Sequence, residues 1–129
     1  MGSRIGVVAV IYAELVTAAR HKGVVSYQDI AKLIGLPLTG SYMGHTIGAY
    51  VGAISQNEAR HQRPLLSAIV VGINGVPGEG FFELARQCGK LKGNTQAEEE
   101  AFWQHERTDI YETWKTIFPK KKLASVVAA

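Results

Sequence analysis

Residues 26 to 82 decide the fold, and they read SYQDIAKLIGLPLTGSYMGHTIGAYVGAISQNEARHQRPLLSAIVVGINGVPGEGFF. The order is a short capped helix, a turn broken by glycine and proline, a longer helix, a polar corner, a β-branched run and a glycine-rich hairpin. This order is typical of a winged helix-turn-helix, whose second helix lies against a nucleic-acid groove while the hairpin contacts the backbone beside it. The stretch therefore predicts an α+β domain that is mainly α and binds nucleic acid.

The first helix of this stretch has clear ends. Ser26 is followed three residues later by Asp29, which is close to a capping box, and the apolar spacing continues to Ile34. Gly35 ends the helix and Pro37 prevents its continuation.

The second helix is expected to begin at a Ser41 cap and to run to about Ala59. A stripe of apolar residues at spacings of three and four predicts its core face, namely Met43, Ile47, Val51 and Ile54. Gly44, Gly48 and Gly52 also recur every fourth residue, and each costs about 1 kcal/mol in a helix relative to alanine. Such a ladder indicates close approach by a neighbouring helix, which we favour, or by a ligand backbone.

The second half of the stretch predicts a strand and a small wing. Leu65 to Val71 is a short apolar run rich in β-branched residues, which fits a buried strand. Asn74-Gly75 is a strong hairpin signal. Pro77-Gly78 cuts the return strand short, so the wing is expected to be small.

Helical segments flank this unit. Arg4 to Lys22 predicts a helix that is apolar almost all round, so it either crosses the centre of the fold or pairs with a second copy. The second option is a homodimer formed through Ile5, Val8, Tyr12 and Leu15. Helices are also expected from Glu79 to Gln87 and, after a Thr95–Glu98 capping box, to about Phe118. Residues 1–119 are thus predicted as one domain and residues 120–129 as a disordered tail.

The charge and composition of the chain limit the classes of function that it can have. The net charge of the 129-residue chain is +3, but residues 1–94 hold nine Lys/Arg against five Asp/Glu, whereas residues 95–119 hold two against six. A modestly basic body favours a polyanion with modest, salt-sensitive affinity. The single cysteine, Cys88, excludes an internal disulfide and a multi-thiolate zinc site, and we expect it to be buried. The apolar run Ile5 to Val16 is too short to cross a bilayer, and we expect a cytoplasmic protein.

Four short segments carry a resemblance to a known family. They are VSYQDIA at residues 25–31, GLP at 35–37, TIGAYV at 46–51 and PLLSAIVV at 64–71. Together they resemble the C-terminal winged-helix domain of alkylguanine-DNA alkyltransferases and alkyltransferase-like proteins. The resemblance implies a winged helix that recognises modified or distorted bases in DNA.

The chain departs from that family at its reactive centre. Ser67-Ala68-Ile69-Val70 stands where the family has its reactive cysteine followed by histidine and arginine, and Cys88 lies about twenty residues further on. His45 falls near the position of the arginine on the family's recognition helix. We therefore expect a DNA-binding scaffold without alkyl transfer.

The candidate nucleic-acid-binding residues fall into three groups. On the second helix they are Ser41, Tyr42, His45, Thr46 and Tyr50, because the N-terminal half of a recognition helix meets base edges. At the polar corner they are Arg60, His61 and Arg63, which suit phosphate contacts. On the first helix of the unit they are Gln28 and Lys32, which would flank the duplex.

No pattern predicts catalysis. The four histidines, His21, His45, His61 and His105, show no metal-ligand spacing, and no nucleophile-elbow, phosphate-loop or dinucleotide motif is present. We expect no enzymatic activity, no metal and no cofactor. The alternative function is a protein-interaction or homodimerisation module, and a hydrolase using His61 with a distant acid is the least supported.

Overall fold

The computed structural model describes residues 4–38 and 40–115. Five α-helices dominate the described part: α1 (Arg4–Arg20), α2 (Tyr27–Ile34), α3 (Ser41–Arg60), α4 (Glu79–Gln87) and α5 (Gln96–Trp114). Two short strands, β1 (Val25–Ser26) and β2 (Val70–Val71), and one 3-10 helix, η1 (Leu66–Ile69), complete it. The expected α+β class with mainly helical content is confirmed.

The two strands form a parallel pair that joins distant parts of the chain. Val25 lies opposite Val70 and Ser26 opposite Val71. Because β1 leads directly into α2 and β2 follows η1, the pairing fixes the start of α2 against the segment that comes after α3.

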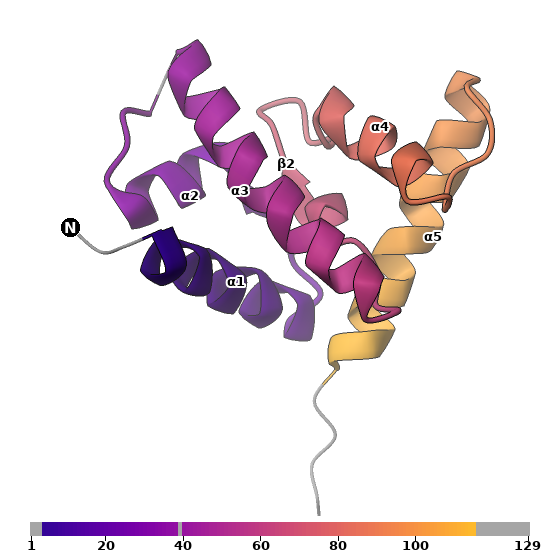
Figure 1. The fold of residues 1–129 in the computed structure, drawn as a ribbon, viewed down its shortest axis with the longest axis horizontal. Helices are drawn as coiled ribbons and strands as arrows, with labels where there is room; N and C mark the ends of the chain where they lie inside the picture. Colours follow the sequence, from indigo (N-terminus) through magenta and orange to yellow (C-terminus); the bar gives the residue numbers. More distant parts are fainter. Residues whose placement is uncertain (1–3, 39, 116–129) are drawn as a thin grey trace, which may run out of the picture.

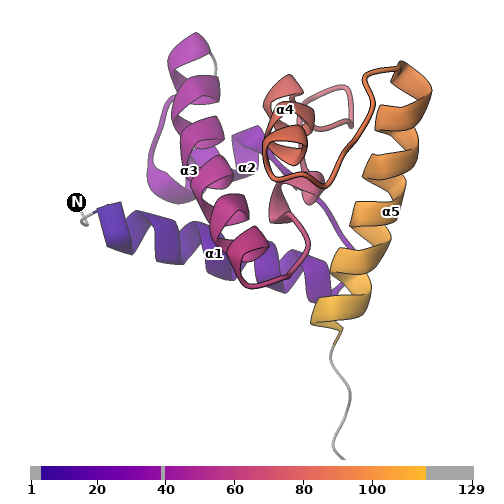
Figure 2. The same ribbon diagram turned by 45° about the vertical axis from the view of Figure 1, so that its right-hand side comes forward.

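The helices surround this pair from several sides (Figures 1 and 2). α1 crosses behind α3, α4 lies between α3 and α5, and the C-terminal end of α5 meets the C-terminal end of α1. α3 contacts α1, α2, α4 and η1, whereas α5 contacts α1 and η1. α1 and α3 are therefore the two helices on which the others pack, since α1 contacts α2, α3 and α5.

The segment from Leu65 to Val71 is buried along its whole length, as expected, but it is not a strand throughout. Leu66–Ile69 forms η1, and only Val70–Val71 is extended. The strand prediction failed here because side chains, rather than a neighbouring strand, bind much of this backbone. A β-branched run in the sequence does not distinguish a buried strand from a buried irregular segment whose backbone is bound by side chains.

Three polar side chains satisfy the backbone of the buried segment. The N–H of Leu65 donates to the carboxylate of Glu106 at 2.8 Å, and the N–H of Ser67 donates to Ser55 Oγ at 2.9 Å. The indole N–H of Trp103 donates to the carbonyl of Ala68 at 2.8 Å. Since an unpaired buried backbone group costs about as much as a lost hydrogen bond, these contacts allow an irregular segment to occupy the core.

The expected β-hairpin is wrong in one respect. Asn74-Gly75 does form a tight turn, in which the N–H of Gly75 donates to Gly72 and the N–H of Gly72 donates to the carbonyl of Val76, both at 3.0 Å. No return strand follows within residues 40–115, where the only strand pairing is β1 with β2. Pro77 lacks an N–H, and α4 begins two residues later, so the chain has no length for a second strand.

The helix ends agree with most of the sequence signals. Ser26 and Asp29 form a capping box, and Gly35 ends α2 with φ of 79°. The box between Thr95 and Glu98 is also present. Ser41 is not a cap: Gly40 occupies that position, so α3 begins without a capping side chain.

Other expectations differ in detail or fall outside the structure. α1 ends at Arg20 rather than Lys22, and Cys88 is half-buried rather than buried. The predicted end of the last helix at Phe118 and the predicted disordered tail 120–129 lie outside the described residues. Within the described ranges, none of the helices combines the length and hydropathy that crossing a membrane requires.

The same substitution at two isoleucines tests this architecture. Ile69 is fully buried in η1, whereas Ile73 in the turn is 92% exposed. Ile69→Ala should lower the free energy of unfolding by about 2–5 kcal/mol, because it removes buried methylene groups and leaves a cavity. Ile73→Ala should change it by about 0.5 kcal/mol or less. Urea denaturation of both variants measures the difference, and equal losses would contradict the placement of η1 in the core.

Candidate nucleic-acid interface

The N-terminal half of α3 forms an exposed ridge. Tyr42 is 68% exposed, Ser41 and His45 are exposed, and Thr46 and Tyr50 are half-buried. The sequence of α3 places no Asp, Glu, Lys or Arg before Glu58, so the ridge carries no permanent charge. Gly40 at the cap offers no side chain to the start of α3, and the first turn of the helix contains no acidic residue to offset the positive end of the helix dipole.

The residues predicted to bind nucleic acid lie on both sides of this ridge. His45, Thr46 and Tyr50 border a depression toward α1, together with Val8. Gln28, by contrast, borders a depression on the other side, which Met43 and the turn around Ile73 also line. Lys32 is exposed on α2. A duplex on the ridge would touch both sides, as expected for a helix that enters a groove.

Arg60 and His61 lie at the far end of α3, away from the ridge. Both are exposed, and a helix of this length spans about 30 Å. These two residues therefore form a separate polar corner rather than part of the same contact surface.

Arg63 is engaged inside the fold. Its guanidinium donates to both carboxylate oxygens of Glu58, with distances of 3.0 Å from Nε and 2.7 Å to the second oxygen. Glu58 is fully buried, and the hydroxyl of Tyr12 lies 3.4 Å from each of its oxygens. The hydrogen bond to Glu58 raises the pKa of Arg63, while burial and the same carboxylate raise the pKa of Tyr12. The charge of Arg63 is thus already paired, which gives it a structural role.

Replacing Arg63 and Arg60 one at a time separates the structural role of Arg63 from phosphate binding. Arg63→Ala should lower the free energy of unfolding by about 3 kcal/mol or more, because it leaves the Glu58 carboxylate buried without a partner. Arg60→Ala should have an effect within about 0.5 kcal/mol. Thermal and urea denaturation would measure both, and the double variant Glu58→Gln/Arg63→Ala should recover part of the loss. Equal stability of both single variants would contradict the pairing.

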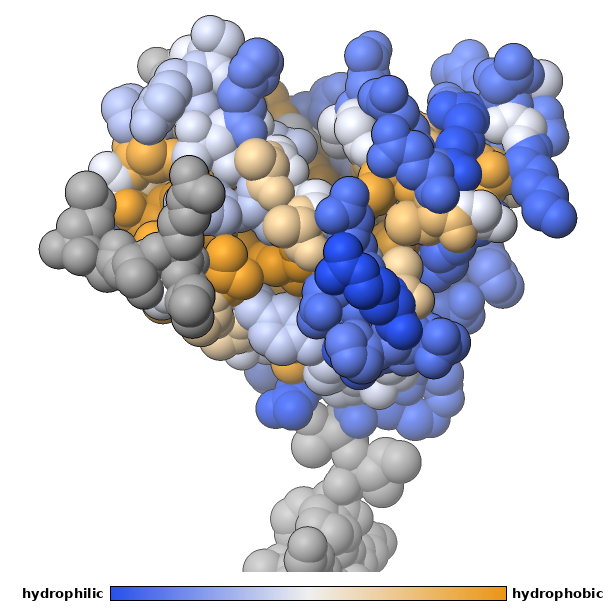
Figure 3. All heavy atoms as spheres, viewed as in Figure 1, coloured by the Kyte–Doolittle hydropathy of each residue, from blue (hydrophilic) through white to orange (hydrophobic). Residues whose placement is uncertain are grey.

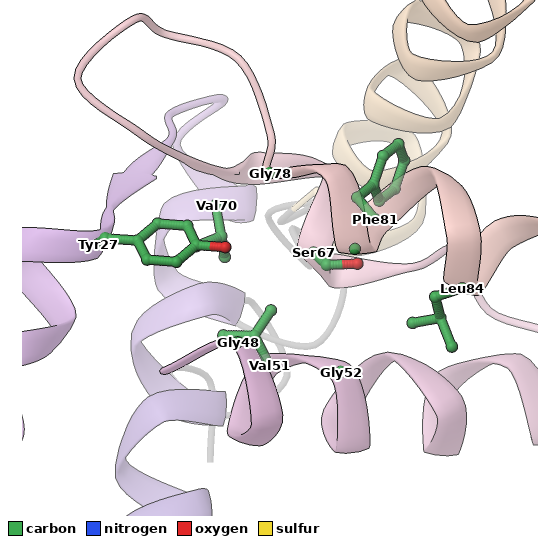
Figure 4. A pocket seen from close by; sticks show the side chains of 10 residues that line it. Tyr27, Gly48, Val51, Gly52, Ser67, Val70, Gly78, Phe81 and Leu84 are labelled. Atoms are coloured by element: carbon green, nitrogen blue, oxygen red, sulfur yellow. The ribbon is translucent and has the colours of Figure 1, made fainter. Parts of the chain in front are cut away.

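A cavity of about 110 Å³ lies against the glycine face of α3, which we define as Gly44, Gly48 and Gly52. Gly48 and Gly52 line it from α3, Tyr27 comes from α2, and Ser67 comes from η1. Figure 4 shows the Tyr27 ring and the Ser67 side chain between α3 and the segment that carries Gly78 and Phe81. The cavity thus lies where α2, α3, η1 and α4 meet.

Two hydroxyl groups give the otherwise apolar cavity polar character. Burial raises the pKa of Tyr27 above its ordinary value, so the phenol stays neutral across the physiological range. A Cβ on Gly78 would come within 3.0 Å of the Tyr27 hydroxyl, so glycine at this position leaves room for the phenol. Ser67 Oγ accepts a hydrogen bond from Ser55 Oγ at 2.8 Å.

The glycine face is not explained by close helix packing. A Cβ built on Gly44, Gly48 or Gly52 would meet no atom within 4 Å. The neighbouring helix that we favoured as the reason for the ladder therefore does not approach closely enough to require glycine. What remains is an unobstructed strip of α3 backbone that lines the cavity at Gly48 and Gly52.

Sequence reasoning did not select the cavity residues as a site. The sequence connects Tyr27 and Ser67 only through the resemblance to the alkyltransferase domain, and it places Gly78 in a glycine-rich turn and Phe81 in the predicted helix from Glu79 to Gln87. The useful signal was the glycine spacing itself, because three glycines in one helix carry a cost that packing does not explain.

A groove lies between α1 and α3, and the ridge residues Tyr42 and His45 form part of its α3 wall. Two adjoining depressions share Val8 and Ala53, and we call them together the α1–α3 groove. Apolar surface is visible between these helices in Figure 3. Of the residues expected to pair with a second copy, Val8 and Tyr12 line the groove and are half-buried. Leu15 is fully buried and unavailable to a partner, and the side chain of Ile5 lies outside the described residues.

In the part of the chain that the structure describes, no three His, Cys, Asp or Glu side chains are placed to share a metal ion. Comparisons with protein-family models, with curated proteins and with solved structures found no match to this chain. The function must therefore be argued from the surfaces described above.

Substituting alanine for Gly48 tests whether the glycine face serves packing. Gly48→Ala should raise the free energy of unfolding by about 0.5–1 kcal/mol, because the added methyl meets open space and alanine is the better helix former. The matched control is Gly89→Ala, at φ of 75°, which should destabilise the protein because alanine is strained there. Destabilisation by Gly48→Ala would show that the face is closed by packing in solution.

Proposed function

We propose that the protein binds DNA without catalysing a reaction on it, using α2 and α3 as a helix-turn-helix, and that it prefers modified or distorted duplexes. The observation that carries the proposal is the glycine face of α3, where Gly48 and Gly52 line the cavity although each glycine weakens the helix. A helix retains such residues where another molecule must approach its backbone.

The exposed ridge supports a groove contact. An α-helix fits the major groove of B-DNA, and the uncharged ridge with Tyr42 and His45 offers hydrogen bonds and apolar contacts to base edges. The uncapped start of α3 and the exposed Lys32 on α2 offer contacts to phosphate. With so few cations, the affinity depends weakly on salt compared with that of strongly basic DNA-binding proteins.

The cavity supports a preference for altered duplexes. Gly48 and Gly52, which line it, lie on the same helix as the ridge, so the cavity can receive a base group that a distorted or modified base pair displaces from the stack. Such a base costs less to expose than a normally paired one. Tyr27 and Ser67 supply hydroxyls that can hydrogen-bond to that group, and Phe81 and Leu84 supply apolar contact.

The same cavity argues against chemistry. The hydrogen-bond partner of the Ser67 hydroxyl is the hydroxyl of Ser55, which is not a general base. The two carboxylates that are buried in the described fold are already engaged, Glu58 with Arg63 and Glu106 with Lys90. We therefore assign recognition, and no reaction, to this site.

A duplex-binding experiment tests the proposal. Fluorescence anisotropy with a matched duplex and with one containing a mismatch or an O-alkylated guanine, each at two salt concentrations, should show tighter binding to the altered duplex. His45→Glu should weaken binding on the order of tenfold, because it places a carboxylate on the ridge against DNA. Gln96→Glu, which adds the same charge at an exposed site on α5, should have little effect. Absence of wild-type binding even at low salt would refute the proposal.

The second candidate function is an interaction module that uses the α1–α3 groove. The observation in its favour is the apolar groove itself, because contiguous exposed apolar surface often marks a protein interface. A second copy of the chain is the occupant we would test first. Sedimentation velocity over a range of concentrations distinguishes the two functions, since self-association without DNA binding would favour the module.

A further inference from the structure

We propose that Ile73 is an apolar wedge that inserts between stacked bases of the duplex bound by α3. This inference rests on the proposed function and adds a residue that neither the ridge nor the cavity contains. In this proposal, the turn between β2 and α4 contacts base steps and not phosphates.

The exposure of Ile73 sets it apart. At 92% it is far more exposed than the other large apolar side chains that the described residues expose, of which Tyr42 follows at 68% and Val24 at 49%. Single exposed apolar side chains are ordinary on protein surfaces, so it is the position of Ile73 beside the proposed DNA face that assigns it a role.

The turn holds this side chain in a fixed position. Gly72 and Val76 are joined by a backbone hydrogen bond of 3.0 Å across Ile73, and the N–H of Val76 also donates to the side chain of Asn74 at 3.3 Å. The turn is anchored at one end by the buried strand β2 and at the other by the buried Pro77. Because isoleucine is stiff at χ1, little side-chain freedom remains to be lost on insertion.

The position of the turn matches the proposed DNA face. Ile73 borders the same depression as Gln28 from α2 and Met43 from the first turn of α3. Tyr27 and Gly78 line both this depression and the cavity. An inserted Ile73 would therefore sit beside the place where a displaced base group is received, and would occupy the space that the displaced base leaves. Apolar wedges of this kind partly unstack a base step and kink the duplex.

The charges around the turn favour a base contact over a phosphate contact. Glu79 and Glu99 also line the depression. Glu99 is paired with Arg86, whereas Glu79 lies in the first turn of α4 and carries its negative charge near the turn. A phosphate would be repelled here, but an uncharged base stack would not.

The test uses a duplex with 2-aminopurine, whose fluorescence rises when the base is unstacked, placed beside a mismatch. The wild-type protein should raise the fluorescence on binding. Ile73→Ala should lose most of that rise and bind on the order of tenfold more weakly, because the wedge contact is gone. Val10→Ala removes an apolar side chain that is 45% exposed on α1, away from the turn, and should leave both the rise and the affinity unchanged. Circular dichroism confirms that both variants are folded.

The possible failures can be told apart. If the wild-type protein binds no duplex, the proposed function and the wedge are both refuted. If it binds and depends on His45, but Ile73→Ala keeps the full fluorescence rise and affinity, only the wedge is refuted. The wedge is also refuted if Ile73→Ala abolishes self-association while DNA binding stays normal, since Ile73 would then be a protein contact.

Discussion

The fold depends on one constraint, which is that an irregular backbone segment, Leu65 to Val71, occupies the centre of the core. A buried backbone must have its polar groups satisfied, and here the Ser55 hydroxyl, the Glu106 carboxylate and the Trp103 indole bind them while β2 pairs with β1. These side chains come from α3 and α5, so the same hydrogen bonds also fix the two longest helices. Loss of any of them leaves a buried polar group unpaired, which is costlier than the loss of an exposed contact.

The candidate site follows from the same constraint. η1 places Ser67 in the cavity, and β2 carries the chain out of the core into the turn that exposes Ile73. The parallel pairing with β1 sets the start of α2, and with it Tyr27, beside both. On the α3 side, Gly48 and Gly52 line the cavity beside Val51, so part of the space stays unfilled at the cost of helix stability. Stability given up in this way is typical of binding surfaces.

The sequence predicted the helices well because their signals are local. The Ser26 and Thr95 capping boxes and the glycine that ends α2 act over three or four residues, and the structure has all of them. The strand from Leu65 to Val71 and the hairpin failed because their outcome depends on distant partners, such as Glu106, that no local pattern reveals. The sequence also could not show that Arg63 is engaged inside the fold. Its pairing with a buried carboxylate is visible only in the folded chain. The cavity was anticipated only in part, through the glycine ladder.

The central claim is that DNA meets the glycine face of α3 and the turn beside it. Mapping backbone amide shifts in a ¹⁵N-labelled protein during titration with a mismatched duplex tests this most directly. The account predicts that the largest shifts fall on Tyr42 and His45 of the ridge, on Gly44, Gly48 and Gly52, and on residues 72–78, with little change in α5. Shifts confined to the α1 side of the α1–α3 groove, at Val8, Ala9 and Tyr12, or no shifts at all, would contradict it.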